Sequence, residues 1–321
     1  MNQITIALMG DVMLGRLVGE ALAKGKSDVF PWGDFLPLLQ SVDFRLLNLE
    51  NALTLSEKKV PKVFNFKTIP EHVAVLKSAS IDVVNLANNH ILDYGEEGLI
   101  DTLETLDKAG IEHVGAGVSF NEAAKGIICE KKGIKIGILG CTDNEPTWLA
   151  KEKKPGTHYI RVGDISSLET IIPTLKSMVD LLILSIHWGP NMKLRPDSTF
   201  RKFAKQLIDL GVDIIHGHSA HVFQGIEIYK NKLILYDTGD FIDDYSIDSE
   251  LRNDLSFLYL IDVMDSEIQT LRLIPNKIQG FRANRAGRLA SEFAIDRMIT
   301  LSKELGTSFD ISQGELYVRL A

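Results

Sequence analysis

Three histidines fall within six residues, and they are the densest group of possible metal ligands in a chain that has eight histidines in all. His218 and His221 follow an apolar run and Gly217. Three residues apart across the glycine-led turn, they can reach one centre. His216 falls inside the strand period and is interpreted as structural. The spacing predicts a transition-metal site at the end of a buried strand.

A second group of polar residues ends another apolar run, at residues 85–93. Asn89 offers an amide oxygen and His90 an imidazole, which suit metal ligation or proton transfer. Asp93, three residues later, can orient the His90 ring. The alternative is a structural histidine that is hydrogen-bonded in the core. We predict that these residues are functional.

Asp11, Glu50 and His187 each stand at the end of a separate apolar run. A buried carboxylate is costly without a partner, so the two acids need a counter-charge or solvent. Taken singly, Asp11 also fits a turn or helix cap, Glu50 a surface turn and His187 a structural core position. Because five apolar runs end in such residues, we favour one shared metal site.

These residues need elements that bring distant parts of the chain together. Short runs rich in Ile, Val and Leu alternate with segments of helical periodicity, which predicts an α/β fold with a largely parallel or mixed sheet covered by helices. The carboxyl ends of such strands meet at one edge of the sheet. The expected strands are 4–9, 44–49, 82–87, 134–140, 181–186 and 212–216, and the expected helices are 70–80, 95–109, 166–178 and 198–210, with Gly110 and Gly211 as caps.

The last third of the chain has closely spaced strands that predict an antiparallel meander. We expect residues 222–321 to belong to the same domain as the rest, so that one domain spans residues 1–321. Two Lys-rich, proline-bearing segments, 56–62 and 145–156, predict surface loops. The expected late strands are 225–229, 232–236, 257–263, 268–273 and 315–319, and the expected helix is 288–305.

Bulk composition limits the classes of partner. A net charge of −8, a pI near 5.5 and the lack of any Lys or Arg run argue against nucleic-acid binding. No window is apolar enough to span a membrane and the first residues lack a signal-peptide pattern, so we expect a cytoplasmic protein without membrane insertion. Cys129 and Cys141 are expected in the core. The sequence does not indicate an oligomeric state.

Several charged residues near these motifs are candidates for substrate binding. Asp240 follows an apolar run and supplies a further carboxylate near a strand end. The neighbouring Asp243 and Asp244 are expected in a solvated loop. Cationic side chains that can hold an anionic substrate are Arg16, Lys67, Lys193 and Arg195.

Taken in order, these motifs resemble those of the CapA family of capsule or poly-γ-glutamate biosynthesis proteins, within the calcineurin-like metallophosphoesterase superfamily. The resemblance covers most of the chain. The motifs that carry it are Gly-Asp-Val-Met-Leu-Gly-Arg at 10–16, Asn-Leu-Glu at 48–50, Asn-Asn-His-Ile-Leu-Asp-Tyr-Gly at 88–95, His-Trp-Gly at 187–189, Gly-His-Ser-Ala-His at 217–221 and Gly-Asp-Phe at 239–241.

The resemblance implies a metallophosphatase-like four-layer α-β-β-α sandwich with two mixed sheets and a dinuclear metal centre. It implies that His90 donates a proton to the leaving group and that Asp93 orients it. Glu50 would bridge the two ions. The implied ligands of one ion are Asp11, Glu50 and His221, and those of the other are Glu50, Asn89, His187 and His218.

Two positions depart from the superfamily pattern. The superfamily has His two residues after the Asp of its first motif, whereas this chain has Met13, a thioether that suits Mn²⁺ or Mg²⁺ poorly. The implied bridging residue is Glu50 where the superfamily mostly has Asp, although Asn-Leu-Glu is usual for CapA-like proteins. We therefore expect the site that contains Asp11 to bind its ion more weakly. The alternative is that Asp240, a carboxylate from a later strand, fills the vacancy that Met13 leaves.

Three functions fit these residues. Mixed nitrogen and oxygen ligands without thiolates favour Mn²⁺, Zn²⁺ or Fe. The resemblance implies two such ions, which would activate a water molecule. The first hypothesis is a phosphoesterase that hydrolyses a small anionic phosphate ester. The second is a non-hydrolytic component of poly-γ-glutamate synthesis, and the third is an amide hydrolase of γ-glutamyl bonds. Turnover of aryl phosphates, set against release of glutamate from the polymer, separates them.

Overall fold

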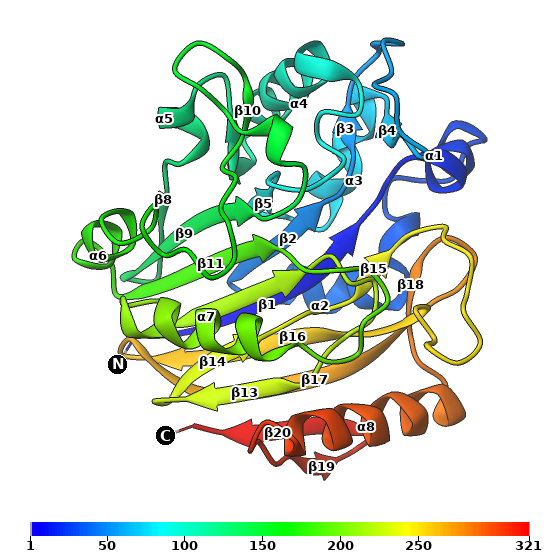
Figure 1. Ribbon diagram of the computed structural model, residues 1–321. Coiled ribbons are helices and arrows are strands. Elements are labelled where there is room, and N and C mark those ends of the chain that lie inside the picture. Colours follow the sequence, from blue (N-terminus) through cyan, green and yellow to red (C-terminus); the bar gives the residue numbers. More distant parts are fainter. Residues whose placement is uncertain (1, 321) are drawn as a thin grey trace.

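Two large β-sheets face each other in the computed structural model, which describes residues 2–320, and helices cover their outer faces (Figure 1). Residues 1 and 321, the ends of the predicted domain, lie outside the described residues. Alternate residues of each strand point to opposite faces of a sheet. On β1 (Gln3–Val12), Ile6 and Leu8 therefore pack in the core between the sheets, whereas Ala7 and Met9 pack against helices. The predicted four-layer sandwich is confirmed.

The first sheet has ten strands in the described residues and is mixed. Its parallel part surrounds β1, which pairs with β2 on one side and with the short β15 on the other. Its antiparallel part begins where β16 pairs with β1. The other strands are β2 (Phe44–Leu49), β5 (Val83–Asn85), β6 (Glu112–Val114), β15 (Asp240–Ile242), β16 (Leu255–Met264), β17 (Glu267–Ile278), β18 (Ala283–Arg285), β19 (Asp310–Ser312) and β20 (Glu315–Arg319).

The second sheet has six strands in the order β13-β14-β12-β11-β9-β8, and its central four are parallel. Two further pairs of short strands lie outside both sheets. The six strands are β8 (Ile127–Lys131), β9 (Ile134–Thr142), β11 (Leu181–His187), β12 (Ile214–His218), β13 (Ile226–Tyr229) and β14 (Lys232–Leu235), and the short pairs are β3 (Ala52–Leu53) with β4 (Lys67–Thr68) and β7 (Ala116–Gly117) with β10 (Gly156–Thr157).

The predicted late meander is wrong, because its strands divide between the two sheets. The hairpin of β13 and β14 extends the six-stranded sheet, whereas β16 and β17 belong to the ten-stranded sheet. The chain crosses between them through Gly239, whose φ of 69° suits a glycine, and then pairs with β1 as β15. Because β16 pairs directly with β1, we propose that the last third belongs to the same domain, as the sequence predicts.

Helices pack on the outer face of each sheet, except α8, which packs against the core between the sheets (Figure 1). Of the predicted helices, 95–109 and 198–210 are confirmed almost to the residue, and 166–178 is shorter than predicted. Gly110 ends its helix in the left-handed conformation, as predicted. The helices are α1 (Arg16–Ala23), α2 (Leu36–Ser41), α3 (Val73–Ser78), α4 (Gly95–Ala109), α5 (Phe120–Ala123), α6 (Ile171–Lys176), α7 (Ser198–Asp209) and α8 (Arg288–Lys303), with 3₁₀ turns η1 (Phe30–Phe35), η2 (Pro70–His72) and η3 (Pro146–Trp148).

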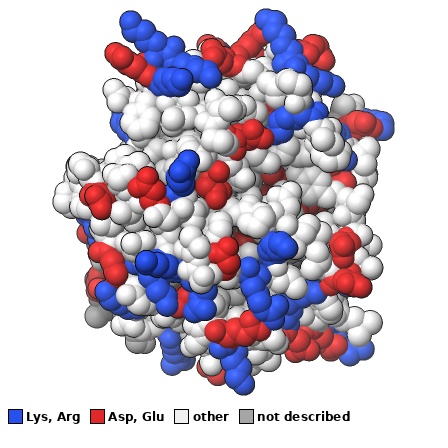
Figure 2. Space-filling model, in the orientation of Figure 1, with Lys and Arg blue, Asp and Glu red and all other residues white. Residues whose placement is uncertain are grey.

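Surface charge, cysteine burial and helix length bear on the predictions made from bulk composition. Acidic and basic side chains are interspersed on the face that Figure 2 shows, and no continuous basic stripe crosses it. Cys141 is buried and Cys129 half-buried, and neither forms a disulfide. Among residues 2–320, no helix combines the length and apolar character needed to cross a bilayer.

Candidate metal centre

The predicted site residues come together where strands of both sheets end. Asp11 lies near the end of β1 and Glu50 directly follows β2, in the ten-stranded sheet. His187 and His218 are the last residues of β11 and β12, in the six-stranded sheet, where they are paired in register. These four side chains are almost completely buried. Parallel strand order therefore produces the convergence that the sequence predicts.

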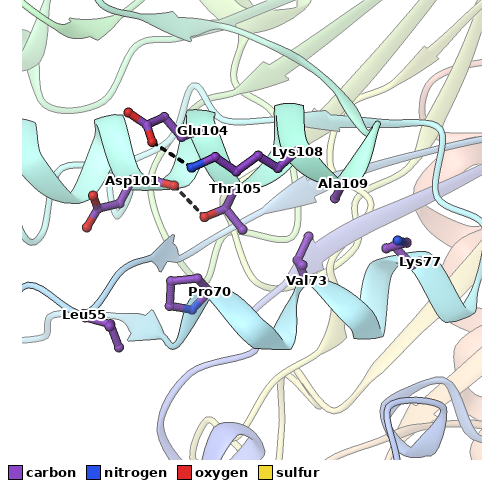
Figure 3. A pocket seen from close by; sticks show the side chains of 9 residues that line it. All are labelled: Leu55, Pro70, Val73, Lys77, Asp101, Glu104, Thr105, Lys108 and Ala109. Atoms are coloured by element: carbon purple, nitrogen blue, oxygen red, sulfur yellow. Dashed lines mark hydrogen bonds and ion pairs between the residues drawn. The ribbon is translucent and has the colours of Figure 1, made fainter.

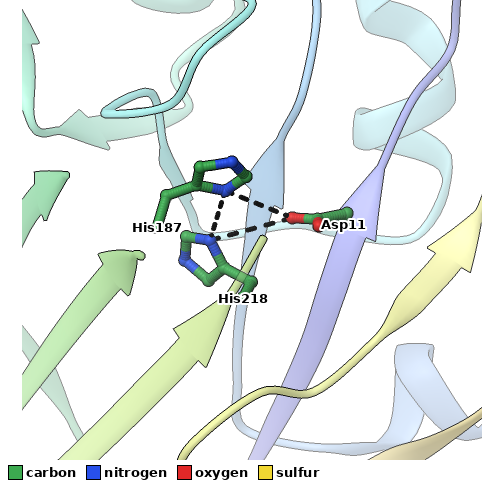
Figure 4. A group of neighbouring side chains, drawn as sticks. All are labelled: Asp11, His187 and His218. Carbon is green, nitrogen blue, oxygen red and sulfur yellow. Dashed lines mark hydrogen bonds and ion pairs between the residues drawn. The ribbon is translucent and has the colours of Figure 1, made fainter. Parts of the chain in front are cut away.

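Asp11, His187 and His218 form one candidate cation site, here called the histidine cluster (Figure 4). Asp11 Oδ1 lies 3.7 Å from the Nδ1 atoms of both histidines, which are 2.9 Å apart. Burial lowers the pKa of both imidazoles well below the usual value, so they are neutral at pH 7. A neutral imidazole is the form that binds metals.

Asn89 contacts the histidine cluster at the second ring nitrogen of His187. Its Oδ1 lies 3.0 Å from Nε2 of His187, the nitrogen that does not face Asp11. Glu50 Oε1 also lies on this side, 3.9 Å from Nε2. Asn89 and Glu50 are thus brought to His187 as expected, and their role as ligands stays a prediction. His216 belongs to neither candidate cluster and contacts Ser185 Oγ.

Asp11, Glu50, His221 and Asp240 form a second candidate site, here called the carboxylate cluster. Possible ligand atoms of these four residues lie within 4.8 Å of one another. His221 Nδ1 is 2.9 Å from Asp240 Oδ1 and 3.7 Å from Asp11 Oδ2. Asp11 therefore contributes one oxygen to each cluster. The sequence assigned Asp240 to the substrate, but its side chain is fully buried beside His221.

Buried oxygens of the carboxylate cluster lack hydrogen-bond donors. Asp11 Oδ2, Glu50 Oε1 and Asp240 Oδ2 accept no hydrogen bond from the described residues. Burial raises the pKa of Asp11 to about 6, and it raises the pKa values of Glu50 and Asp240 well above their usual range. Unpaired carboxylates are costly in the interior, and a bound cation removes that cost. The donor set fits divalent metal ions.

His221 has the opposite electrostatic environment from His187 and His218. Burial alone would lower its pKa, but the charges of Glu50 and Asp11 outweigh burial and raise it. Tyr245 donates from its hydroxyl to Glu50 Oε2 at 3.0 Å, and its ring packs edge-on against His221. No sequence pattern marked Tyr245, because it lies in a polar loop after β15.

A chain of asparagines fixes the position of Asp11. Asn48 Nδ2 donates to Asp11 Oδ1 at 2.6 Å. Asn85 and Asn88 in turn donate from Nδ2 to Asn48 Oδ1, at 2.9 and 3.1 Å. These asparagines could have been found from the sequence, because Asn48 and Asn85 each place an amide inside an otherwise apolar strand.

The sulfur of Met13 already has a hydrogen-bond partner in the backbone. Its side chain is fully buried, and its Sδ accepts a hydrogen bond from the backbone N–H of Gly15 at 3.0 Å. The adjacent Leu14 N–H donates to Asn51 Oδ1. The turn after β1 thus holds the thioether against the backbone.

His90 lies beside the clusters in a defined orientation. Its Nδ1 is 2.6 Å from Asp93 Oδ2, as predicted, and its ring stacks on Phe66 with 3.9 Å between centroids. Lys62 Nζ lies 3.0 Å from Asp93 Oδ1. Burial lowers the pKa of His90 to about 4, outweighing the contact with Asp93. Lys62 and Phe66 were missed in the sequence, since both lie in the loop between β3 and β4.

Arg16 reaches the neighbourhood of His90. Its guanidinium carbon lies 5.5 Å from the ring centroid of Phe66, the residue that stacks on His90. Its Nε is 3.3 Å from Asp244 Oδ2. The expectation that Asp243 and Asp244 are solvated is wrong, because both side chains are buried and Asp244 also accepts from the N–H of Leu17.

Two other predicted substrate residues have partners elsewhere. Lys67 Nζ bonds the backbone oxygen of Ser56 and the carboxylate of Glu57. Arg195 forms two hydrogen bonds of 2.6 Å with Glu304 on the surface. Neither contacts a residue of the two clusters in these bonds. Their roles in substrate binding stay predictions.

A separate groove lies between α3 and α4, and it has different chemistry. Figure 3 shows Leu55, Pro70 and Val73 along one wall and helix α4 along the other. The groove has a volume of about 440 Å³. Lys108, its cation on α4, pairs with Glu104 at 2.9 Å. The groove therefore differs from the candidate metal centre, whose carboxylates are buried and each have one oxygen without a hydrogen-bond donor.

Comparison with known proteins identifies relatives of the chain. The model of a family described as "Bacterial capsule synthesis protein PGA_cap" matches residues 5–245. A probable polyglutamine synthesis accessory protein of Mycobacterium tuberculosis (strain H37Rv) is 32% identical over 94% of this chain and 92% of the relative. The PGA biosynthesis protein CapA of Bacillus subtilis (strain 168) is 34% identical over 75% of this chain and 63% of the relative.

Solved structures match the chain at low sequence identity. A hypothetical protein from Thermus thermophilus matches with a TM-score of 0.52 and 14% identity, over 86% of this chain and 100% of that chain. A 5'-nucleotidase precursor from the same organism matches with a TM-score of 0.48 and 13% identity, over 95% of this chain and 59% of that chain. The first likeness concerns the fold alone, and the second is too weak to carry an argument.

Proposed function

The chain belongs to the bacterial capsule synthesis protein family PGA_cap, and from this premise we propose that it is a metal-dependent hydrolase of the metallophosphoesterase type. We propose that the histidine and carboxylate clusters each hold a divalent ion and that the substrate is a small anionic phosphate ester. The observation that carries the proposal is the set of buried, unpaired carboxylate oxygens beside neutral imidazoles. Among side-chain ligands, this mixture suits divalent transition metals.

Bound ions of this kind supply Lewis-acid polarisation of a phosphoryl oxygen and a water molecule that ionises near neutral pH. Asp11 holds both clusters together, since one of its oxygens faces each. Asn48 keeps that carboxylate in place through its short hydrogen bond. Tyr245 holds Glu50 in the same way.

His90 is the proposed proton donor to the leaving group. Asp93 binds Nδ1 and so leaves Nε2 as the atom that exchanges a proton. The lowered pKa of His90, about 4, makes its cation a strong acid. An anionic substrate beside the ring raises this pKa and promotes protonation. Phe66 restricts the ring by stacking on it.

Positively charged side chains near His90 favour the binding of an anionic substrate. Arg16 is partly exposed and lies over Phe66, where Asp244 fixes its Nε. Its backbone has a positive φ of 47°, which is unusual for a residue other than glycine and is often retained at functional sites. The side chain of Lys62 is one-fifth exposed and forms ion pairs with Asp93, the partner of His90, and with Glu145. We propose that Arg16 binds a substrate oxygen.

The names of the relatives favour a second function. The M. tuberculosis relative is described as an accessory protein of polyglutamine synthesis and the B. subtilis relative as a PGA biosynthesis protein. In that case the same site would bind or cleave a γ-glutamyl chain, whose repeated carboxylates also suit Arg16. A metal-activated water attacks a carbonyl by the same Lewis-acid chemistry.

Turnover tests of the purified protein separate these functions. We expect the Mn²⁺- or Zn²⁺-loaded protein to hydrolyse nitrophenyl phosphate or bis-nitrophenyl phosphate. His90→Asn should keep its metal and lose about 10²–10⁴-fold in turnover, the usual contribution of general acid catalysis. The matched control is His113→Asn, which changes a histidine on β6 that pairs with Asp107.

Three results would decide against parts of this proposal. Full turnover by metal-loaded His90→Asn would remove the role assigned to His90. Release of glutamate from γ-linked polyglutamate, with no cleavage of phosphate esters, would favour the second function. A protein that takes up no divalent metal would contradict both forms of hydrolase.

A further inference from the structure

We propose that the two clusters bind chemically different ions, because Asp240 supplies to the carboxylate cluster the ligand that Met13 does not. The carboxylate cluster would then select a hard divalent ion such as Mn²⁺ or Mg²⁺, and the histidine cluster a borderline ion such as Zn²⁺. This inference rests on the proposed function in one respect, namely that divalent ions bind.

Met13 is held by the backbone. Its sulfur accepts the N–H of Gly15, and the whole side chain is buried. Turning the thioether toward an ion would leave that N–H without its acceptor, and thioether sulfur is in any case a soft ligand. The residue therefore offers nothing to Mn²⁺ or Mg²⁺ from its present position.

Asp240 is placed beside Asp11 by strand pairing. β15 runs parallel to β1, with Asp240 opposite Asp11 in the register. The close approach depends on Gly10, because a Cβ there would lie only 1.7 Å from the backbone oxygen of Gly239. That oxygen accepts the N–H of Asp11 at 3.0 Å. The backbone therefore fixes Asp240 next to the cluster.

The Asp240 carboxylate is oriented but not fully paired. Its Oδ1 is 2.9 Å from His221 Nδ1, and its buried Oδ2 has no donor among the described residues apart from the neighbouring carboxyl group of Asp243. Asp11 Oδ2 and Glu50 Oε1 are unpaired in the same way. Once ionised, these three buried carboxylates carry more negative charge than a single imidazole can offset, and a divalent ion offsets the excess.

The donor sets of the two clusters differ in hardness. The carboxylate cluster offers oxygens from Asp11, Glu50 and Asp240 and one imidazole, and Mn²⁺ and Mg²⁺ prefer such oxygen-rich sets. The histidine cluster offers two imidazoles and one carboxylate, a set that suits Zn²⁺. A histidine at position 13 would have made the two sets more alike.

Titration of metal-free protein tests the inference by calorimetry and by the electron paramagnetic resonance signal of bound Mn²⁺. Wild-type protein should take up one equivalent of Zn²⁺ and then one of Mn²⁺. Asp240→Asn should weaken Mn²⁺ binding by at least about tenfold, the loss seen even for outer partners of metal ligands. Binding of the first Zn²⁺ should stay within a factor of about three, since that cluster keeps all its residues.

Two further variants distinguish a loss of metal binding from misfolding. Asp262→Asn removes a carboxylate on β16 that bonds Thr5 and Thr270, away from the clusters, and should change neither affinity. Met13→His combined with Asp240→Asn should regain a second equivalent, now of Zn²⁺ in preference to Mn²⁺. This rescue cannot occur if Asp240→Asn has simply unfolded the protein.

The outcomes distinguish this inference from the proposed function. Unchanged Mn²⁺ affinity in Asp240→Asn, or two equivalents of Zn²⁺ that bind equally and exclude Mn²⁺ in the wild type, would overturn the inference and leave a metal-dependent hydrolase standing. Failure of the wild type to bind either ion would refute the proposed function itself.

Discussion

Single residues around Asp11 decide how its two oxygens are used. Oδ1 receives the Asn48 amide at 2.6 Å and faces the two histidines, while Oδ2 has no donor among the described residues. Asn48 is in turn held by the amides of Asn85 and Asn88. The orientation of Asp11 is thus set by residues that are not candidate metal ligands.

The first prediction at this scale concerns Asn48→Ala. It removes the donor to Asp11, whereas the amides of Asn85 and Asn88 keep their bonds to the backbone oxygens of Ala87 and Leu49. A buried polar group left unpaired costs about 1–3 kcal/mol, so the free energy of unfolding should fall by about that amount. Zn²⁺ affinity should fall too, because Asp11 is no longer held. Denaturant unfolding and calorimetric titration measure the two effects.

A control separates positioning from general loss of stability. Asn284 also donates its amide to several backbone oxygens, but it lies on β18, away from the clusters. Asn284→Ala should lower stability without changing metal affinity. Equal affinity in both variants would show that Asn48 does not position Asp11.

Individual site residues were predictable where a strand end marked them. Asp11, Glu50, His187, His218 and His221 follow apolar runs, and the parallel topology brings such positions together. Residues that act from loops or from inside strands carry no such signal, because their partners are distant in sequence. Tyr245 and Lys62 in loops and Asn48 inside a strand are examples.

At the scale of elements, the close approach of β15 to β1 brings the late part of the chain to the site. The approach requires glycine at position 10, where a Cβ would overlap the backbone of Gly239. The strand end at β12 has a similar contact, since a Cβ on Gly217 would lie 2.1 Å from the oxygen of Tyr236. Glycine at these places permits backbone packing that no other residue allows.

We predict that Gly10→Ala is strongly destabilising. Overpacking typically costs about 1–3 kcal/mol, and a backbone overlap cannot be relieved by turning a side chain. Because β15 must move away, Mn²⁺ affinity should fall together with stability. Gly287→Ala is the control, since nothing lies within 4 Å of the added Cβ. Its cost as a helix N-cap should be about 1 kcal/mol, with no effect on metal.

Long periodic elements were predictable, and the connections between sheets were not. The helices at 95–109 and 198–210 have clear periodicity and glycine at their ends. The late strands were identified individually, but their assignment to one meander was wrong. The alternation of apolar and polar residues within a strand does not reveal which sheet the strand joins. The parallel pairing of β14 with β12 and of β15 with β1 determines that division.

At the scale of the whole molecule, buried acids make the stability of metal-free protein depend on pH. Burial, followed by the charge of Asp11, raises the pKa of Asp237 to about 8. An acid whose folded pKa is raised gives stability below its unfolded pKa, and that stability is lost as pH rises through the folded value. Glu50 and Asp240 have pKa shifts in the same direction.

The histidines change the stability of the metal-free protein in a different range of pH. The lowered pKa of His90, about 4, gives stability that is complete above pH 6.5, the unfolded value, and that is lost as pH falls toward 4. His221, with a raised pKa, loses its contribution as pH rises, like the acids. Between pH 6.5 and 8 the contribution of the histidines with lowered pKa approaches its full value, so the loss from the acids and His221 sets the sign of the net change.

We predict that metal-free protein melts at progressively lower temperature as pH rises from 6.5 to 8. Each group contributes at most about 1.4 kcal/mol per pH unit. Loading with Mn²⁺ should remove most of this slope, because the ion keeps the carboxylates of its cluster ionised throughout. Calorimetric melting of chelated and loaded samples measures both slopes. A melting temperature that rises over this range without metal would contradict the assigned pKa directions.

Because the two clusters draw on both sheets, they can form only after the sheets have docked. Asn48 and His187, which lie in contact, are 139 residues apart in sequence, and closing loops of that length costs entropy before any contact is gained. Contacts of such long range slow folding. Ions bound at both clusters would therefore join the two sheets only late in folding. We expect such ions to slow unfolding more than they accelerate folding.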